Sequence, residues 1–144
     1  MARVSTFLCF NRKTEQAFLF YQQIFGGEFS DPFYRFGDMP FVPGQKPMAE
    51  QDKNLVTHVA LPILGGHVIM GADHLDSEPE LQFGNTIFLT LEPETMEESQ
   101  RLFSALSAEG KVEIDFQKMY WGAYYAKWVD KFGVGWMLNF QLKE

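Results

Sequence analysis

The sequence predicts an α+β fold of two tandem βαβββ modules with a cavity. The order strand, helix and three further strands occurs twice along the 144 residues. Sliding the chain on itself by 81 positions pairs similar residues, such as Phe7 with Phe88 and Thr14 with Thr95. Each half offers one helix for four strands, so one face of each sheet stays uncovered. The two sheets are therefore expected to surround a cavity or to pack against another copy of the chain.

Four elements are expected before the first hairpin. β-branched and aromatic residues predict a strand over 4–10. Apolar residues then recur with the period of a helix over 14–25, which a pair of glycines ends. Residues 28–36 predict a second strand. Residues 37–54 hold three prolines and predict a long loop, which we expect to act as a lid or as a contact with a second subunit.

A hairpin and a linker complete the first half. Apolar strands are expected over 55–63 and 67–72, and the two glycines between them are a hairpin signal. The acidic stretch that follows contains Pro79 and predicts a linker. The length is typical of one domain. We therefore expect a single domain over 1–144 with module one at 1–73, a linker at 74–83 and module two at 84–144.

The second half repeats the plan. Residues 86–91 predict a strand whose alternate side chains lie on opposite faces of the sheet. These faces are expected to divide into Ile87, Leu89 and Leu91 beneath the helix, and Thr86, Phe88 and Thr90 toward the cavity. Thr95 and Glu98 are spaced as a capping box that opens the helix, and Gly110 is expected to close it. Three further strands are predicted over 112–119, 123–129 and 134–140.

Charge and composition exclude several classes of function. The chain has 12 Lys and Arg against 19 Asp and Glu, a formal charge of −7, with no basic cluster. Nucleic acid and membrane surfaces are therefore not expected partners, because both are recognised through clustered positive charge. No apolar run is long enough for a membrane span or a signal peptide, which predicts a cytoplasmic protein. The single Cys9 is expected to be structural.

Several motifs together resemble one known group of proteins. They are His58-Val59-Ala60-Leu61, Gly65-Gly66, Met70-Gly71-Ala72-Asp73, Tyr120-Trp121-Gly122-Ala123, Asp130-Lys131-Phe132-Gly133 and Trp136-Met137-Leu138-Asn139. The sequence resembles the PhnB-like branch of the vicinal oxygen chelate superfamily, which contains glyoxalases, bleomycin-resistance proteins and extradiol dioxygenases. The resemblance covers nearly the whole chain. It implies the glyoxalase/bleomycin resistance fold, in which the two modules form a half-open barrel with a central cavity, and it implies a homodimer.

The resemblance also implies where a metal ion would be held. In the metal-dependent enzymes of the superfamily, the first and last strand of each module supply His, Gln or Glu ligands. The corresponding positions here are Ser5, Met70, Thr86 and Met137. A thioether is a soft ligand and a neutral hydroxyl is a poor one for Mg²⁺, Mn²⁺, Fe²⁺ or Zn²⁺. We therefore predict no metal and no other cofactor, and a divalent metal only if the site is shifted from these strands.

Candidate ligand-binding residues come from three patterns. His58 is an imidazole in an apolar strand, where it needs a hydrogen-bond partner, and it either anchors a ligand or serves the core or a subunit interface. The stretch 120–125 is dense in aromatic residues around a glycine, and either stacks a planar ligand or packs an interface. The third pattern is the side of the first strand of each module that is expected to face the cavity, together with the polar Asn139 of the last strand. The candidates are His58, Phe7, Thr86, Phe88, Tyr120, Trp121, Tyr125, Met137 and Asn139.

These patterns predict a metal-independent protein that binds a small, partly apolar organic molecule in the cavity. The alternative is a metal-dependent glyoxalase- or dioxygenase-like lyase or isomerase with His58 as one ligand, and a third possibility is a metal-free enzyme with His58 as general base. No residue is assigned a catalytic role. Some relatives carry a demethylubiquinone methyltransferase label, but we expect no methyl transfer because no separate nucleotide-binding domain is apparent. The sequence does not identify the ligand.

Overall fold

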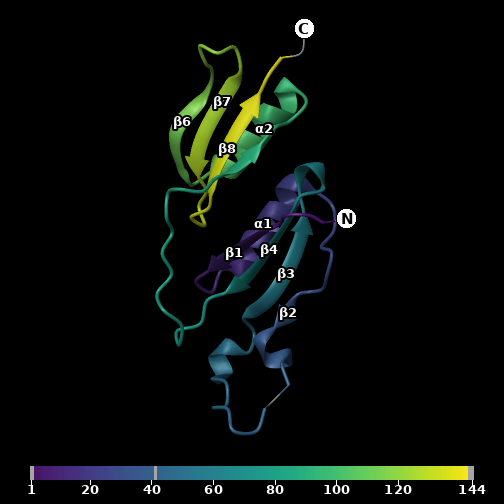
Figure 1. Cartoon of the computed structure of the whole chain (residues 1–144), viewed down its shortest axis with the longest axis vertical. Coiled ribbons are helices and arrows are strands. Elements are labelled where there is room, and N and C mark those ends of the chain that lie inside the picture. Colours follow the sequence, from purple (N-terminus) through teal and green to yellow (C-terminus); the bar gives the residue numbers. More distant parts are fainter. Residues whose placement is uncertain (1, 41, 143–144) are drawn as a thin grey trace. The chain divides into compact units, whose positions relative to one another are not determined.

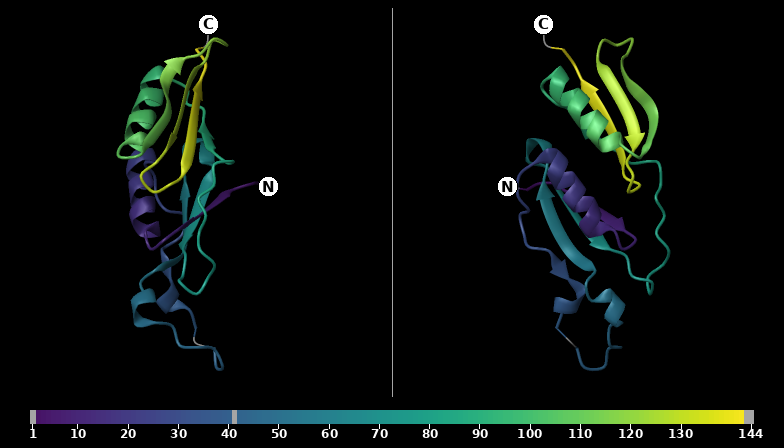
Figure 2. Two further views of the ribbon diagram at one scale, coloured as in Figure 1. Left: turned by 90° about the vertical axis from the view of Figure 1, so that its left-hand side faces the viewer. Right: turned by 180° about the vertical axis from the view of Figure 1, so that it is seen from behind.

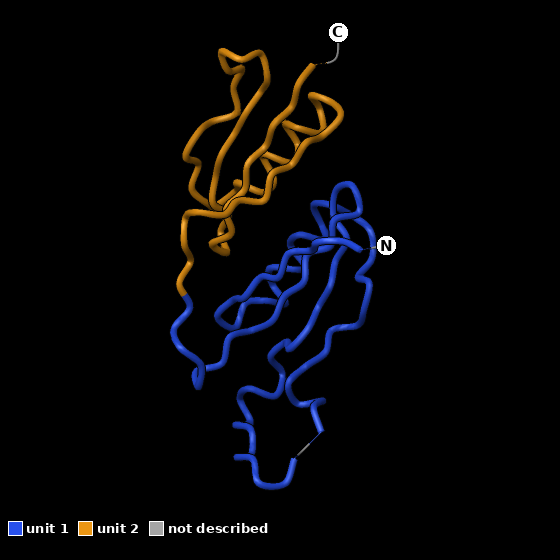
Figure 3. The backbone as a smooth tube through the Cα atoms, viewed as in Figure 1, with its two compact units in different colours: residues 1–81 blue, residues 82–144 orange. Residues whose placement is uncertain are grey.

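The computed structural model describes residues 2–40 and 42–142. The chain divides into two compact units, residues 1–81 and residues 82–144, which Figure 3 shows in different colours. Each unit has its own sheet and its own helix. No helix among the described residues is both long and apolar enough to cross a membrane.

The first unit is a four-stranded sheet with one long helix (Figure 1). Its strands lie in the order β1-β4-β3-β2, with β1 parallel to β4 and the other neighbours antiparallel. The helix α1 packs on β3 and β4. The bounds are β1 Thr6–Phe10, α1 Thr14–Phe25, β2 Tyr34–Arg35, β3 Val56–Pro62 and β4 Val68–Asp73.

The second unit repeats this topology. Its strands lie in the order β5-β8-β7-β6, again with the first strand parallel to the last and the other neighbours antiparallel. The bounds are β5 Leu89–Leu91, α2 Met96–Ser107, β6 Lys111–Lys118, β7 Tyr124–Val129 and β8 Gly135–Phe140. The predicted α+β class and the two tandem βαβββ modules are therefore confirmed.

In each unit, the helix covers one face of its own sheet (Figure 2). Phe18 of α1 is fully buried and meets Phe10 edge to face at 6.3 Å between ring centroids. In the second unit, Phe103 of α2 meets the buried Trp128 in the same way at 5.3 Å. Because burying apolar surface is the main stabilising contribution, these faces form the two cores. We call the opposite face of each sheet its open face.

Two buried carboxylates bind the backbone where elements join. Asp73 accepts hydrogen bonds from the N–H of Thr14, at the start of α1, and from the N–H of Val56, at the start of β3. Asp130 accepts from two backbone N–H groups of the β7–β8 turn and from Trp136 Nε1 at 2.8 Å. Burying a carboxylate is tolerated when its oxygens are satisfied in this way, so we assign both residues to the fold rather than to chemistry.

Two predicted strands are shorter than expected. Of residues 28–36, only Tyr34–Arg35 form a strand. Pro32 lacks an N–H group, so it cannot donate a hydrogen bond to a neighbouring strand, and the strand begins only after it. Of residues 86–91, only Leu89–Leu91 form a strand and pair with β8. Ile87 is consequently 83% exposed, and the prediction that it packs beneath the helix was wrong.

The first unit contains an insertion that the second lacks. Tyr34 pairs with His58 across β2 and β3, and Gln117 pairs with Tyr125 at the corresponding place across β6 and β7. The first two residues are 24 positions apart and the second two are 8 apart, so the first unit carries 16 additional residues here. They lie in the predicted loop, which also forms short 3₁₀ turns at Phe36–Asp38 and Glu50–Asp52. We call residues 36–53 the insertion.

Arg35 fixes both ends of the insertion to α1. Its guanidinium donates to both carboxylate oxygens of Glu15, at 2.9 and 3.0 Å, and to the carbonyl oxygen of Asn54 at 2.8 Å. The hydrogen bonds from Arg35 lower the pKa of Glu15. A bidentate pair between a guanidinium and a carboxylate is a strong form of ion pair. The two side chains are about one third to one half exposed, however, and solvent weakens the attraction between them.

The variant Glu15→Gln is expected to be less stable than wild type at pH 7, by less than about 1 kcal/mol. Because the pKa of Glu15 is lower in the folded chain, its contribution is present above the unfolded pKa of about 4.3 and is lost as the pH falls through the folded value. Urea unfolding of both proteins between pH 7 and pH 3 should show the difference disappearing toward low pH. Glu80→Gln in the linker is the control, and a difference independent of pH would contradict this assignment.

Candidate functional site

His58 lies on the open face of the first sheet. Its Nε2 is 3.5 Å from Asp31 Oδ2, and its ring lies 6.0 Å from that of Tyr34 between centroids. The His58 side chain is 33% exposed, so it is accessible to a ligand. The carboxylate and the neighbouring ring limit the orientations of the imidazole. His58 therefore presents a partly oriented donor or acceptor on this face.

Apolar side chains share the open face with His58. Ala60, Met70 and Phe7 are partners across three neighbouring strands and thus form one row. Phe7 is 51% exposed. Cys9, which was expected to be structural, is also exposed on this face, but partial burial and the nearby charge of Glu78 raise the pKa of its thiol. A raised pKa leaves little thiolate at neutral pH, so nothing here marks Cys9 as a nucleophile.

The second sheet has a more aromatic open face. Asn139 pairs with Tyr125 across β8 and β7. Trp121 meets Tyr125 edge to face at 5.9 Å, and Tyr120 meets Trp121 at 5.0 Å. Trp121 is 49% exposed and Tyr120 96% exposed. The structure thus brings an amide and two aromatic rings together, with Tyr120 at the outer end of the row.

Lys127 is a candidate site residue that is not among those predicted from the sequence. It pairs with Met137, whose other neighbour is Thr90, so all three lie on the open face of the second sheet. The Lys127 ammonium is 4.6 Å from the centroid of the Phe88 ring and 3.4 Å from Glu113 Oε2. Ala126 and Trp128 are buried beneath the helix. Because side chains alternate along a strand, the apolar residues on either side of Lys127 could have indicated that the lysine lies on the opposite face.

The two open faces correspond position by position. His58 and Tyr125 occupy the same place in their sheets. Each lies two residues before the partner of a methionine, since Ala60 pairs with Met70 and Lys127 pairs with Met137. The predicted candidates thus fall into two sets. His58 and Phe7 lie in the first unit, and the second unit holds Phe88, Tyr120, Trp121, Tyr125, Met137, Asn139 and Thr86. Thr86 lies in the bend before β5 rather than in a strand, contrary to prediction.

The side chains at the implied metal positions do not fit a divalent ion. Met70 and Met137 lie on the open faces as expected, but Ser5 and Thr86 precede their strands. The strand neighbours of the two methionines are instead Phe7 and Thr90. A phenyl ring is no ligand and a threonine hydroxyl is a weak one. Within residues 2–40 and 42–142, no three His, Cys, Asp or Glu side chains gather in a group that could hold a metal ion.

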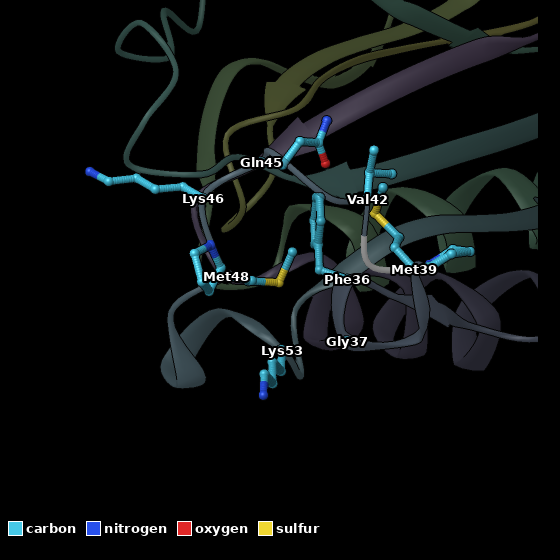
Figure 4. A pocket seen from close by; sticks show the side chains of 10 residues that line it. Phe36, Gly37, Met39, Val42, Gln45, Lys46, Met48 and Lys53 are labelled. Carbon is cyan, nitrogen blue, oxygen red and sulfur yellow. The ribbon is translucent and has the colours of Figure 1, made fainter.

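The insertion encloses a separate pocket of about 300 Å³ (Figure 4). Its walls combine apolar side chains, such as Phe36 and Met48, with polar ones, such as Gln45 and Lys46. Lys53, at the edge, pairs with Glu50 at 2.8 Å. The sequence pattern predicts a loop here but does not indicate this pocket. The expected role of the loop as a lid or subunit contact remains a prediction.

The duplicated βαβββ topology and the two open faces define a protein of the glyoxalase/bleomycin resistance fold. The fosfomycin resistance protein FosX of Listeria monocytogenes is similar in fold, with a TM-score of 0.63 at 14% identity over 99% of this chain and 94% of that one.

Two solved structures are more similar. Protein PA1353 of Pseudomonas aeruginosa has a TM-score of 0.84 at 28% identity, covering 99% of this chain and 100% of that chain. A putative 3-demethylubiquinone-9 3-methyltransferase, PhnB protein, from Bacillus cereus has a TM-score of 0.76 at 25% identity, covering 96% and 99%.

A sequence model described as 3-demethylubiquinone-9 3-methyltransferase matches residues 2–139. Protein YjdN of Escherichia coli (strain K12) is 31% identical over 145 residues, covering 94% of this chain and 93% of that protein. The chain belongs to this family, the PhnB-like branch of the vicinal oxygen chelate superfamily.

Proposed function

We propose that this protein binds a small, partly apolar organic molecule on the open faces of its sheets and needs no metal ion to do so. The observation that carries the proposal is the row of Trp121, Tyr125 and Asn139, in which two aromatic rings lie beside one amide. Ligand sites are typically apolar surfaces with a few placed polar groups. His58 supplies the corresponding polar group on the first sheet.

The donor chemistry supports metal-independent binding over the metal-dependent lyase, isomerase or dioxygenase alternative. Two thioethers, a phenyl ring and one hydroxyl group occupy the strand positions at which the family resemblance implies a cation would be held. They bind hard or borderline cations weakly. The same groups suit contact with an apolar ligand, because a methionine side chain adapts its shape and adds apolar surface.

Methyl transfer is not part of the proposal, although the family description mentions it. The only Gly-x-Gly of the C-terminal region, Gly133 to Gly135, leads into the strand β8. A dinucleotide-type phosphate site requires such a loop to open a helix, where the N-terminal N–H groups face the phosphate. We further propose a cytoplasmic homodimer, in which the insertion supplies contact surface.

A thermal-shift screen of small metabolites tests the proposal. A ligand at 100 times its Kd is expected to add about 2.7 kcal/mol of stability. The stabilisation should persist in EDTA. The variant His58→Ala is expected to weaken binding about tenfold, the effect of losing one hydrogen bond in a partly buried site.

His74→Ala is the matched control, because His74 lies beyond the end of β4. Ligand stabilisation that EDTA abolishes would overturn the metal-independent proposal. The close pair of His58 and Asp31 also favours a second candidate, a metal-free enzyme in which His58 is the general base. In that case His58→Ala would lower the rate with a converted ligand far more than the affinity for it.

A further inference from the structure

The topology of the sheet does not require a lysine at position 127. Lys127 and Ala60 occupy the same place in their sheets, since Lys127 pairs with Met137 as Ala60 pairs with Met70. The first unit thus builds the same topology with a methyl group at this place. Holding a charged group on a half-buried face costs desolvation energy, so a lysine that the topology does not require suggests a ligand.

The contacts of Lys127 leave hydrogen-bonding capacity for such a ligand. An ammonium has three N–H donors. The Phe88 ring attracts the charge through its face, and Glu113 lies 3.4 Å away, longer than a strong charged hydrogen bond. The side chains of Lys127 and Glu113 are 27% and 32% exposed, so the ammonium can be reached from the open face.

We infer that Lys127 binds the carboxylate of a small organic acid whose apolar body rests on Phe88 and Met137. This deepens the proposed function and rests on it. A single negative charge is favoured over a doubly charged phosphate, because Glu113 lies beside the ammonium and the chain has a formal charge of −7. The ring and the thioether supply the apolar contact.

Matched pairs of acids and amides test this inference. Phenylacetate and hexanoate, and their neutral partners phenylacetamide and hexanamide, would be titrated into the full chain. Binding would be followed by NMR, through the chemical shifts of the backbone N–H groups of the protein. We expect each acid to bind at least fivefold more tightly than its amide, with the largest shifts in β7 and β8. The acid affinity should fall as salt is added, because the attraction is electrostatic.

Three variants separate charge from packing. Lys127→Met keeps a long apolar side chain and should remove the preference for the acid, and Lys127→Gln is a second variant should the first fold poorly. Glu113→Gln should keep or increase the preference. Lys118→Met is the control at another lysine of the same hairpin, and its preference should match wild type.

Equal affinity of wild type for acid and amide, or an undiminished preference in both Lys127 variants, would overturn the inference. Amide binding without preference would still support the proposed function. If neither acids nor amides bind, the inference fails, and the metabolite screen decides the proposed function independently.

Discussion

Replacing Asp130 with alanine is expected to lower the free energy of unfolding by about 3 kcal/mol. The carboxylate is 3% exposed and accepts hydrogen bonds from the N–H groups of Phe132 and Val134. It also accepts from Nε1 of Trp136, a fully buried side chain. The variant leaves these donors without that acceptor, and an unsatisfied buried donor is costly because it has also lost its water.

Urea unfolding followed by tryptophan fluorescence measures this effect. Asp130→Asn should be intermediate, because the amide oxygen still accepts. Asp76→Ala is the control, since the Asp76 side chain is 84% exposed and its pair with Arg12 is long at 3.4 Å. A loss of less than about 1 kcal/mol in Asp130→Ala would contradict the view that this carboxylate secures the β7–β8 turn.

The elements with strong local signals were predicted from the sequence. The helical period before the glycine pair placed α1 at the bounds that the structure has, and Ala17, Phe18 and Tyr21 are buried as that period requires. Thr95 caps α2 as predicted, accepting from the N–H of Glu98. The Glu98 side chain does not complete the capping box, because its carboxylate accepts hydrogen bonds from Arg101 instead. These hydrogen bonds lower the pKa of Glu98.

The register between strands could not be read from similarity between the halves. A shift of 81 aligns Phe7 with Phe88, whereas the sheet register places Phe7 beside Met70 and Thr90 beside Met137, which is a shift of 83. Both shifts keep the same side chains on the same face, because strand side chains alternate with a period of two. The pattern of apolar residues therefore predicts the faces but does not distinguish registers that differ by two residues.

The candidate site was only partly predictable for a related reason. Periodicity left open whether His58 and Tyr125 face away from the helices, and the structure places both on open faces. Periodicity also does not reveal that Asp31 lies near His58 or that Lys127 lies over Phe88, because these contacts join residues far apart in the chain. Side-chain partners of this kind depend on tertiary packing rather than on local pattern.

The variant Gly71→Ala is expected to destabilise the protein by about 2–3 kcal/mol, through overpacking beneath α1. Gly71 faces the helix, and a Cβ there would lie 2.9 Å from Cζ of Phe18, which is fully buried and has no room to withdraw. Gly84→Ala is the matched control, because a Cβ at Gly84 meets no atom within 4 Å. Thermal or urea unfolding should show a large loss for the first variant and almost none for the second.

A double-mutant cycle tests whether the clash with Phe18 is the cause. Phe18→Leu alone should destabilise by about 1–2 kcal/mol, because it removes buried apolar surface. Combined with Gly71→Ala, the loss should be smaller than the two single losses added, since the smaller side chain makes space for the new methyl group. If the two losses simply add, Phe18 of α1 does not contact position 71 of β4. The assignment of this face of the first sheet as the one that the helix covers, and of the opposite face as the open one, would then be contradicted.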